Sequence, residues 1–220
     1  VLLKDSWRWS YDGFRLEGDV LADLNAAHVR NVPTLLCHAY VDQPAPLSSH
    51  CCPSDGDAGE QAVSCAPHLV HYRIAVKEVC LPLAAFKSSR QLVSVIADCF
   101  DAHYEAVKKC QTIHRDVSSH NIFIAPTFAR HEDDDGSYGP IRVYWRGILS
   151  DWKISKTTRN NDSHEERIAA TQQLPVRVGT WPYMSVVSLS KTAHEVEVAD
   201  EIESFFYVLL YNAARFTPNN

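Results

Sequence analysis

The sequence predicts an α+β fold in two parts: a small β-sheet with one helix, followed by a mostly helical region. Three short segments in the first 80 residues include β-branched and aromatic residues, which favour strands. Two longer segments in the remainder repeat apolar residues at steps of three and four, the period of an amphipathic helix. The length of 220 residues, 45% of them hydrophobic, is sufficient to bury a sizeable core.

The first part contains the predicted sheet and its helix. Residues 1–8 read as a strand that ends near Asp5, and residues 32–41 and 70–79 read as two further strands. Residues 15–27 predict an amphipathic helix between the first two strands. The apolar positions of this helix are Leu16, Val20, Leu21 and Leu24.

A segment between the last two strands, residues 42–67, is rich in Pro, Ser, Gly, Asp and Ala, so we expect a disordered insertion. Several soft metal ligands gather in and beside it, and four such ligands would suffice to hold zinc. They are His50, Cys51, Cys52, Cys65, His68 and His71. Because no Cys-x-x-Cys pair is present, we expect these side chains to decorate the loop, and the metal we predict is magnesium alone.

The second part is dominated by two predicted helices, at residues 91–110 and 200–214. Short strands are predicted at residues 122–125 and 143–149. The apolar positions of the first helix are Leu92, Val95, Ile96, Cys99, Phe100, His103 and Val107, where His103 reads as a packed core histidine. Those of the second are Ile202, Phe205, Phe206, Leu209 and Leu210.

The most informative feature is the eight-residue stretch from His114 to Asn121, between the long helix and an apolar run. It places Asp116 and Asn121 five positions apart, which resembles the catalytic loop of eukaryotic-type protein kinases. In that loop a carboxylate accepts the proton of an attacking hydroxyl, and an amide oxygen holds a magnesium ion. One motif therefore supplies a base and a metal ligand.

Further motifs follow in the order that this resemblance requires. Lys4 lies on the first predicted strand, Asp151 lies in a turn after a later strand, and Gly179 to Ser185 resembles the end of an activation segment. With these motifs the chain resembles the fungal-type protein kinase family, within the eukaryotic protein kinase-like superfamily, over nearly its whole length. The resemblance implies a two-lobed protein kinase-like fold truncated at both ends, with residues 1–80 as a partial N-lobe and residues 81–220 as a partial C-lobe.

The resemblance implies a constellation of five residues for phosphoryl transfer from ATP. Lys4 would contact the nucleotide phosphates, and Glu17, which we expect on an exposed side of its helix, would steady Lys4. The alternative is that Glu17 is one more solvated helix charge. Asn121 and Asp151 would hold Mg²⁺, and Asp116 would orient and deprotonate a substrate hydroxyl.

Four more residues have roles implied by the resemblance. Glu78 and Cys80 fall where the backbone of a kinase hinge would bind adenine. Arg115 would pair with a phosphorylated residue of the polar segment at 154–178, unless it only packs locally. Thr180 would bond the catalytic aspartate as in serine/threonine kinases, which favours a protein substrate with a serine or threonine hydroxyl.

Four features depart from the kinase pattern. Lys153 replaces the glycine of the Asp-Phe-Gly turn, and Val187 stands where many kinases have a glutamate. Glu201 instead of an aspartate would face the catalytic-loop backbone, unless Asp200 shifts into that role. The chain also begins at the lysine strand, without a glycine-rich loop, and ends shortly after its last predicted helix, so we expect a fragment of a kinase domain.

The sequence therefore predicts an ATP- and Mg²⁺-dependent serine/threonine protein kinase. The main alternative is a catalytically impaired pseudokinase that serves as a protein-interaction module, which the missing glycine loop and shortened second lobe would favour. A third interpretation is a kinase-like enzyme acting on a small-molecule hydroxyl. Thr180 and the long activation segment argue against it.

Charge, hydropathy and cysteine content exclude other classes. The net charge of -6, without a basic stripe, disfavours nucleic acid as a partner. No apolar run approaches the ~20 residues that span a bilayer, and no signal-peptide pattern opens the chain. The 7 cysteines are odd in number and irregular in spacing, which argues against a secreted disulfide framework. We expect an intracellular protein, cytoplasmic or nuclear, and the sequence leaves its oligomeric state open.

Overall fold

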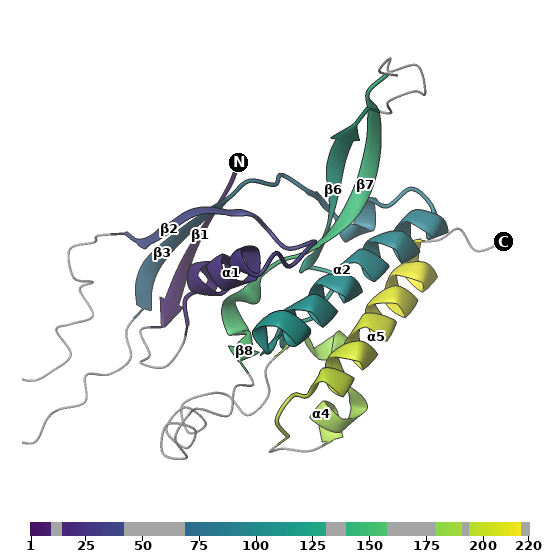
Figure 1. Ribbon diagram of the computed structural model, residues 1–220. Helices are drawn as coiled ribbons and strands as arrows, with labels where there is room; N and C mark the ends of the chain where they lie inside the picture. Colours follow the sequence, from purple (N-terminus) through teal and green to yellow (C-terminus); the bar gives the residue numbers. More distant parts are fainter. Residues whose placement is uncertain (10–14, 42–68, 131–139, 158–178, 191–193, 217–220) are drawn as a thin grey trace, which may run out of the picture.

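The computed structural model of the chain describes residues 1–9, 15–41, 69–130, 140–157, 179–190 and 194–216. Figure 1 shows a small sheet with one helix beside a region built on two long helices, as the α+β prediction requires. Outside the described ranges lie the predicted insertion at 42–67, most of the predicted polar segment, and five of the candidate zinc ligands: His50, Cys51, Cys52, Cys65 and His68.

The first sheet is antiparallel and has the strand order β1-β3-β2. Its strands are β1 (Leu2–Trp9), β2 (Leu35–Tyr40) and β3 (Leu69–Val76), within a few residues of the predicted segments. His71 on β3, the remaining candidate zinc ligand, contacts the carboxylate of Asp5, and its ring stacks on Trp7 at 4.7 Å between centroids. These contacts give His71 a structural role in the sheet.

Helix α1 (Glu17–Ala26) packs against this sheet through Val20, Leu21 and Leu24, all of them buried. Its first turn approaches β2 and β3 closely. The Gly18 amide donates a hydrogen bond to the Tyr72 hydroxyl at 2.9 Å, and a Cβ on Gly18 would lie 2.2 Å from the His38 ring. Glycine at this position therefore sets the depth at which the start of α1, including Glu17, meets the sheet.

The second sheet has the order β4-β6-β7 and contains β4 (Leu81–Pro82), β6 (Ile122–Ala129) and β7 (Arg142–Leu149). The inner half of the β6–β7 hairpin is buried, whereas the outer half projects from the molecule (Figure 1). The strand predicted at residues 122–125 corresponds to β6, and the prediction that it ends at Ala125 is wrong. Pro126 is tolerated because β6 is paired beyond Ile124 with β7 alone, so no second neighbour requires a donated N–H.

Helix α2 (Ser89–Cys110) confirms the predicted helix at 91–110 and begins at a side-chain cap, where Ser88 Oγ accepts a hydrogen bond from the Gln91 amide at 3.2 Å. Its predicted stripe is buried at Leu92, Val95, Ile96, Cys99 and His103, while Phe100 is 37% exposed. The helix lies across β7 and beside α5 (Figure 1). It thereby connects the sheet to the last helix of the described chain.

Helix α5 (Val198–Phe216) also forms where a helix is predicted, but its buried face differs. Of the predicted apolar positions, Ile202, Phe206 and Leu210 are exposed. The buried stripe instead includes polar residues: Glu201, Ser204 and Asn212 beside Phe205 and Val208. Relative to the orientation that would bury its apolar positions, the helix is rotated about its axis, because Glu201 turns inward to bind backbone amides of the loop after α2.

Several short elements connect the longer helices and strands. Strand β5 (Thr112–Ile113) pairs with β8 (Lys156–Thr157), and α4 (Val186–Ser190) precedes α5. The 3₁₀ turns are η2 (Leu83–Ala85), η3 (Trp152–Ile154) and η4 (Trp181–Tyr183). Across the described ranges, no helix has the length and apolar character needed to cross a bilayer.

Candidate active site

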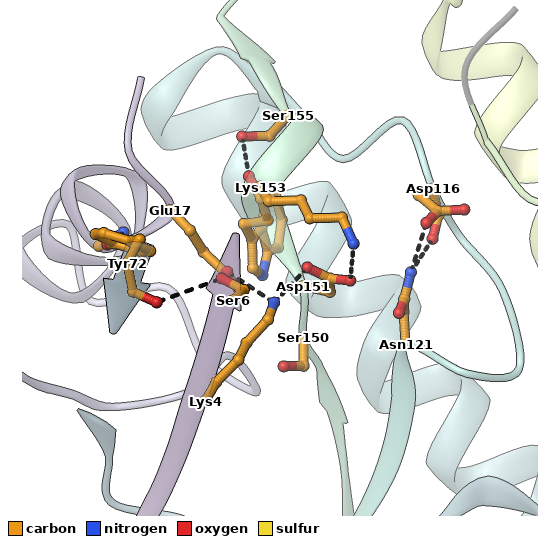
Figure 2. Close-up of polar contacts among 12 residues, drawn as sticks. Lys4, Ser6, Glu17, Tyr72, Asp116, Asn121, Ser150, Asp151, Lys153 and Ser155 are labelled. Carbon is orange, nitrogen blue, oxygen red and sulfur yellow. Dashed lines mark hydrogen bonds and ion pairs between the residues drawn. The ribbon is translucent and has the colours of Figure 1, made fainter. Parts of the chain in front are cut away.

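Lys4 connects the two lobes of the fold by binding one carboxylate in each. Its Nζ donates to Glu17 Oε2 at 2.8 Å and to Asp151 Oδ1 at 2.5 Å (Figure 2). The three residues come from β1, the first turn of α1 and the turn after β7. The predicted contact between Lys4 and Glu17 is present, but the expectation that Glu17 is exposed is wrong. Its side chain is 7% exposed, because the first turn of α1 packs onto the sheet and encloses it.

Burial and charge act against one another in this cluster. Burial raises the pKa of Glu17, and the Lys4 ammonium opposes that effect. For Lys4 itself, burial alone would lower the pKa, but Glu17 and Asp151 together raise it. Burial would raise the pKa of Asp151, yet Lys4 and Lys153 hold it below its usual value. Lys4 and Asp151 are therefore held in their charged forms at neutral pH.

Asp151 lies in a tight turn with a left-handed backbone, at φ 67°. Trp152 anchors the turn: it is fully buried, its Nε1 donates to the Leu149 carbonyl at 2.9 Å, and its ring packs edge-on against His114. Lys153 Nζ then reaches back to Asp151 Oδ2 at 3.0 Å. This contact was not predicted from the sequence. A lysine two residues after an aspartate in a tight turn was the available signal.

The residues of the predicted catalytic loop form a second cluster around Asp116. Its Oδ1 accepts a hydrogen bond from Thr180 Oγ1 at 2.6 Å, the contact expected from the sequence. Its Oδ2 accepts one from Asn121 Nδ2 at 3.0 Å, and the same amide nitrogen donates to the Asp116 carbonyl at 2.8 Å. The Ser150 amide donates to the Asn121 carbonyl at 2.9 Å, which ties this loop to the Asp151 turn.

Glu201 of α5 binds the start of the predicted catalytic loop. Its carboxylate accepts hydrogen bonds from the backbone amides of His114, at 3.0 Å, and Arg115. His103 of α2 also contacts this carboxylate, and both side chains are 2% exposed. Glu201 thus holds the loop where Arg115 has a left-handed backbone, at φ 71°. Asp200 binds elsewhere, with Ser185 and the Glu197 amide among its partners, which settles the alternative raised for this helix.

Comparison with known proteins identifies the family. A model of fungal protein kinases matches residues 43–213. The chain belongs to the fungal protein kinase family. No curated protein matches it in sequence. Among solved structures it is similar to the Rio2 kinase–ADP/Mg²⁺–phosphoaspartate complex from Chaetomium thermophilum, at 14% identity and a TM-score of 0.35. That match covers 71% of this chain and 34% of the Rio2 chain, so the chain spans about a third of that kinase's length.

Of the remaining predicted site residues of this fungal protein kinase, Arg115 directly precedes Asp116 in the second cluster, whereas Glu78 and Cys80 lie away from both clusters. Arg115 Nη1 donates to the Ile154 carbonyl at 3.4 Å, a local contact, and the segment predicted to carry its phosphorylated partner lies largely outside the described residues. Glu78 accepts hydrogen bonds from the Thr34 amide and hydroxyl at 2.8 and 2.7 Å. Burial raises the pKa of Cys80 to about 11, so its thiol stays protonated. Both residues lie on the link between the two sheets, where a hinge is predicted.

The donor set fits the magnesium ion that a kinase implies. Asn121 directs its amide nitrogen at Asp116, so its side-chain oxygen remains as an acceptor, while its backbone carbonyl binds the Ser150 amide next to Asp151. Among the described residues, no three His, Cys, Asp or Glu side chains gather as a metal cage. That is compatible with Mg²⁺, which commonly takes one or two protein ligands and completes its shell with phosphates and water.

Proposed function

We propose that the chain is the catalytic core of an ATP- and Mg²⁺-dependent protein kinase that phosphorylates serine or threonine hydroxyls. The observation that carries the proposal is Lys4, which bridges Glu17 and Asp151. An ammonium group has three N–H donors, and these two contacts leave one for a phosphate oxygen of the nucleotide. An ion pair with a structural role alone would need only Lys4 and Glu17, and would not need Asp151 from the other lobe as well.

Asp116 would act as the base toward the substrate. Each carboxylate oxygen accepts one hydrogen bond, from Thr180 or from Asn121, and retains a lone pair for an incoming hydroxyl. These two donors fix the carboxylate in one orientation, so the proton of the hydroxyl can move to it as the phosphoryl group transfers. The Thr180 contact supports a serine or threonine acceptor.

Asn121 and Asp151 would hold the magnesium ion, which supplies charge neutralisation for the phosphates when bound. Glu17 keeps Lys4 extended toward that position, since its carboxylate is enclosed by α1 and the sheet. The backbone bond from Ser150 to Asn121 keeps the two ligands in one frame.

One observation favours a second function, a pseudokinase that serves as an interaction module. Both carboxylate oxygens of Asp151 already contact a lysine, one from Lys4 and one from Lys153. Asp151 is therefore electrostatically satisfied without a divalent ion.

Two variants separate these functions. Asp116→Ala should abolish phosphoryl transfer to a serine- and threonine-containing protein while ATP still raises the melting temperature in the presence of Mg²⁺. Asp151→Ala should remove the Mg²⁺-dependent part of that stabilisation. Asp101→Ala, which removes an exposed carboxylate on α2, is the matched control and should change neither. If ATP with Mg²⁺ does not stabilise the unmodified chain, the pseudokinase module is the correct function.

A further inference from the structure

Lys153 places a second ammonium group in the candidate active site. Its Nζ lies 3.0 Å from Asp151 Oδ2, and its side chain is 55% exposed. Lys4 by contrast is 33% exposed and is fixed by Glu17 on its other side. The cluster thus contains two carboxylates and two ammonium groups, so its formal charges cancel without any added ion.

The position of the Lys153 ammonium is specific. Lys4 contacts Oδ1 of Asp151, so Oδ2 is the oxygen left for a metal ion, and Lys153 contacts that oxygen. In Figure 2 the Lys153 ammonium lies on the side of Asp151 that faces Asn121. A divalent ion held between Asp151 and Asn121 would therefore meet a positive charge at the place where it must bind.

We propose that Lys153 is a built-in competitor of the divalent cation at Asp151 and thereby sets the Mg²⁺ concentration at which the site fills. The inference deepens the proposed kinase function and rests on it. Two cations on one carboxylate oxygen repel, so binding of the ion requires the Lys153 ammonium to leave Oδ2. The exposure of Lys153 and its flexible stem allow it to do so, whereas Lys4 remains in place.

The test measures binding of a divalent ion to the chain without nucleotide. Mn²⁺ is titrated and followed through water-proton relaxation in the unmodified chain, Lys153→Met and Lys153→Arg. Methionine removes the charge without adding an oxygen ligand, and arginine keeps the charge. Lys156→Met is the matched control, because Lys156 is a nearby lysine whose partner is Glu195.

Lys153→Met should lower the half-saturating Mn²⁺ concentration about fivefold, the factor that corresponds to one partly exposed ion pair. Lys153→Arg and Lys156→Met should both stay close to the unmodified chain. Equal or weaker binding by Lys153→Met would overturn the inference, as would a Lys153→Arg curve that matches it.

A second titration distinguishes this failure from failure of the proposed function. The melting temperature is measured with ATP at increasing Mg²⁺, and Lys153→Met should reach its full stabilisation at about one fifth of the Mg²⁺ that the unmodified chain requires. Equal Mg²⁺ midpoints overturn the role of Lys153 alone. Absence of ATP stabilisation in every variant overturns the kinase function, whatever the Mn²⁺ result.

Discussion

Replacement of Glu201 by alanine should destabilise the protein more than any surface change on the same helix. The Glu201 carboxylate is buried and accepts hydrogen bonds from the backbone amides of His114 and Arg115, and it also contacts His103. Alanine removes the acceptor and leaves the buried amide of His114, the partly buried amide of Arg115 and the buried imidazole of His103 without it. Water cannot replace the carboxylate without opening the packing between α2 and α5.

The magnitude follows from these contacts. Hydrogen bonds to a charged group contribute about 1.5–3 kcal/mol, and each buried donor left unsatisfied costs roughly 1–3 kcal/mol. We therefore expect Glu201→Ala to lower the free energy of unfolding by about 4 kcal/mol, a large part of the ~5–15 kcal/mol of an ordinary domain. Glu201→Gln keeps one acceptor oxygen at the same place and should lose about half as much.

Urea denaturation followed by tryptophan fluorescence measures this loss, because Trp152 is buried against His114 beside the affected loop. With a denaturant slope of about 2 kcal/mol per molar urea, the midpoint of Glu201→Ala should fall by about 2 M. Glu203→Ala is the control. Its carboxylate binds the Val186 amide at 3.0 Å at a more exposed position and should cost less than about 1 kcal/mol. Equal midpoints for the Glu201 and Glu203 variants would refute the reasoning.

Three further predictions concern the loop and the strand beside it. Gly147→Ala should destabilise the protein by about 3 kcal/mol in the same urea assay, because the new Cβ would lie 2.1 Å from the Val95 carbonyl of α2; a change below about 0.5 kcal/mol would contradict this. Burial lowers the pKa of His114, so below about pH 6.5 the unfolded chain binds a proton there that the folded protein excludes. The free energy of unfolding should therefore fall as the pH drops through 6.5, less steeply in His114→Gln, and parallel pH profiles would count against this cause. Thr180→Val removes the 2.6 Å hydrogen bond to Asp116 and should lower kcat about tenfold without changing KM for ATP, whereas Thr180→Ser should retain activity; equal kcat in both variants would exclude the positioning role.

Local patterns predicted most elements of the fold. The helix predicted at 91–110 is observed as Ser89–Cys110. Its apolar stripe is uninterrupted and a serine caps its first turn, and both signals can be read from neighbouring residues of the sequence. The strand that continues through Pro126 was missed, since its tolerance depends on how many neighbours the strand has. That number is a property of the sheet and is not encoded next to the proline.

The candidate site was predicted where it follows a family pattern and missed where it depends on this chain's own geometry. The contacts of Lys4 with Glu17 and of Thr180 with Asp116 follow from the order of the motifs. The burial of Glu17 requires knowledge of how deeply α1 enters the sheet. The contact of Lys153 with Asp151 requires the left-handed turn at φ 67°, which the apolar and polar pattern does not specify.

The inward face of α5 shows the same limit. The sequence offers a broad apolar stripe, and apolar burial alone would turn Phe206 and Leu210 toward α2. The structure exposes both and buries Glu201, because two backbone amides at the start of the predicted catalytic loop would otherwise lack an acceptor. The need of the loop's backbone amides for a hydrogen-bond acceptor thus outweighs the hydrophobic pattern of α5.

The bridge made by Lys4 also affects how the protein is made. Lys4 and Asp151 are separated by 147 positions in the chain, and closing a loop of that length costs roughly 4 kcal/mol of conformational entropy. During synthesis, Lys4 and Glu17 emerge from the ribosome well before the Asp151 turn, so both wait for the partner that completes their cluster. Contacts of such long sequence separation form late and slowly. The proposed phosphate site can therefore assemble only after residue 151 has been translated, and a nascent chain that stops before this residue cannot form it.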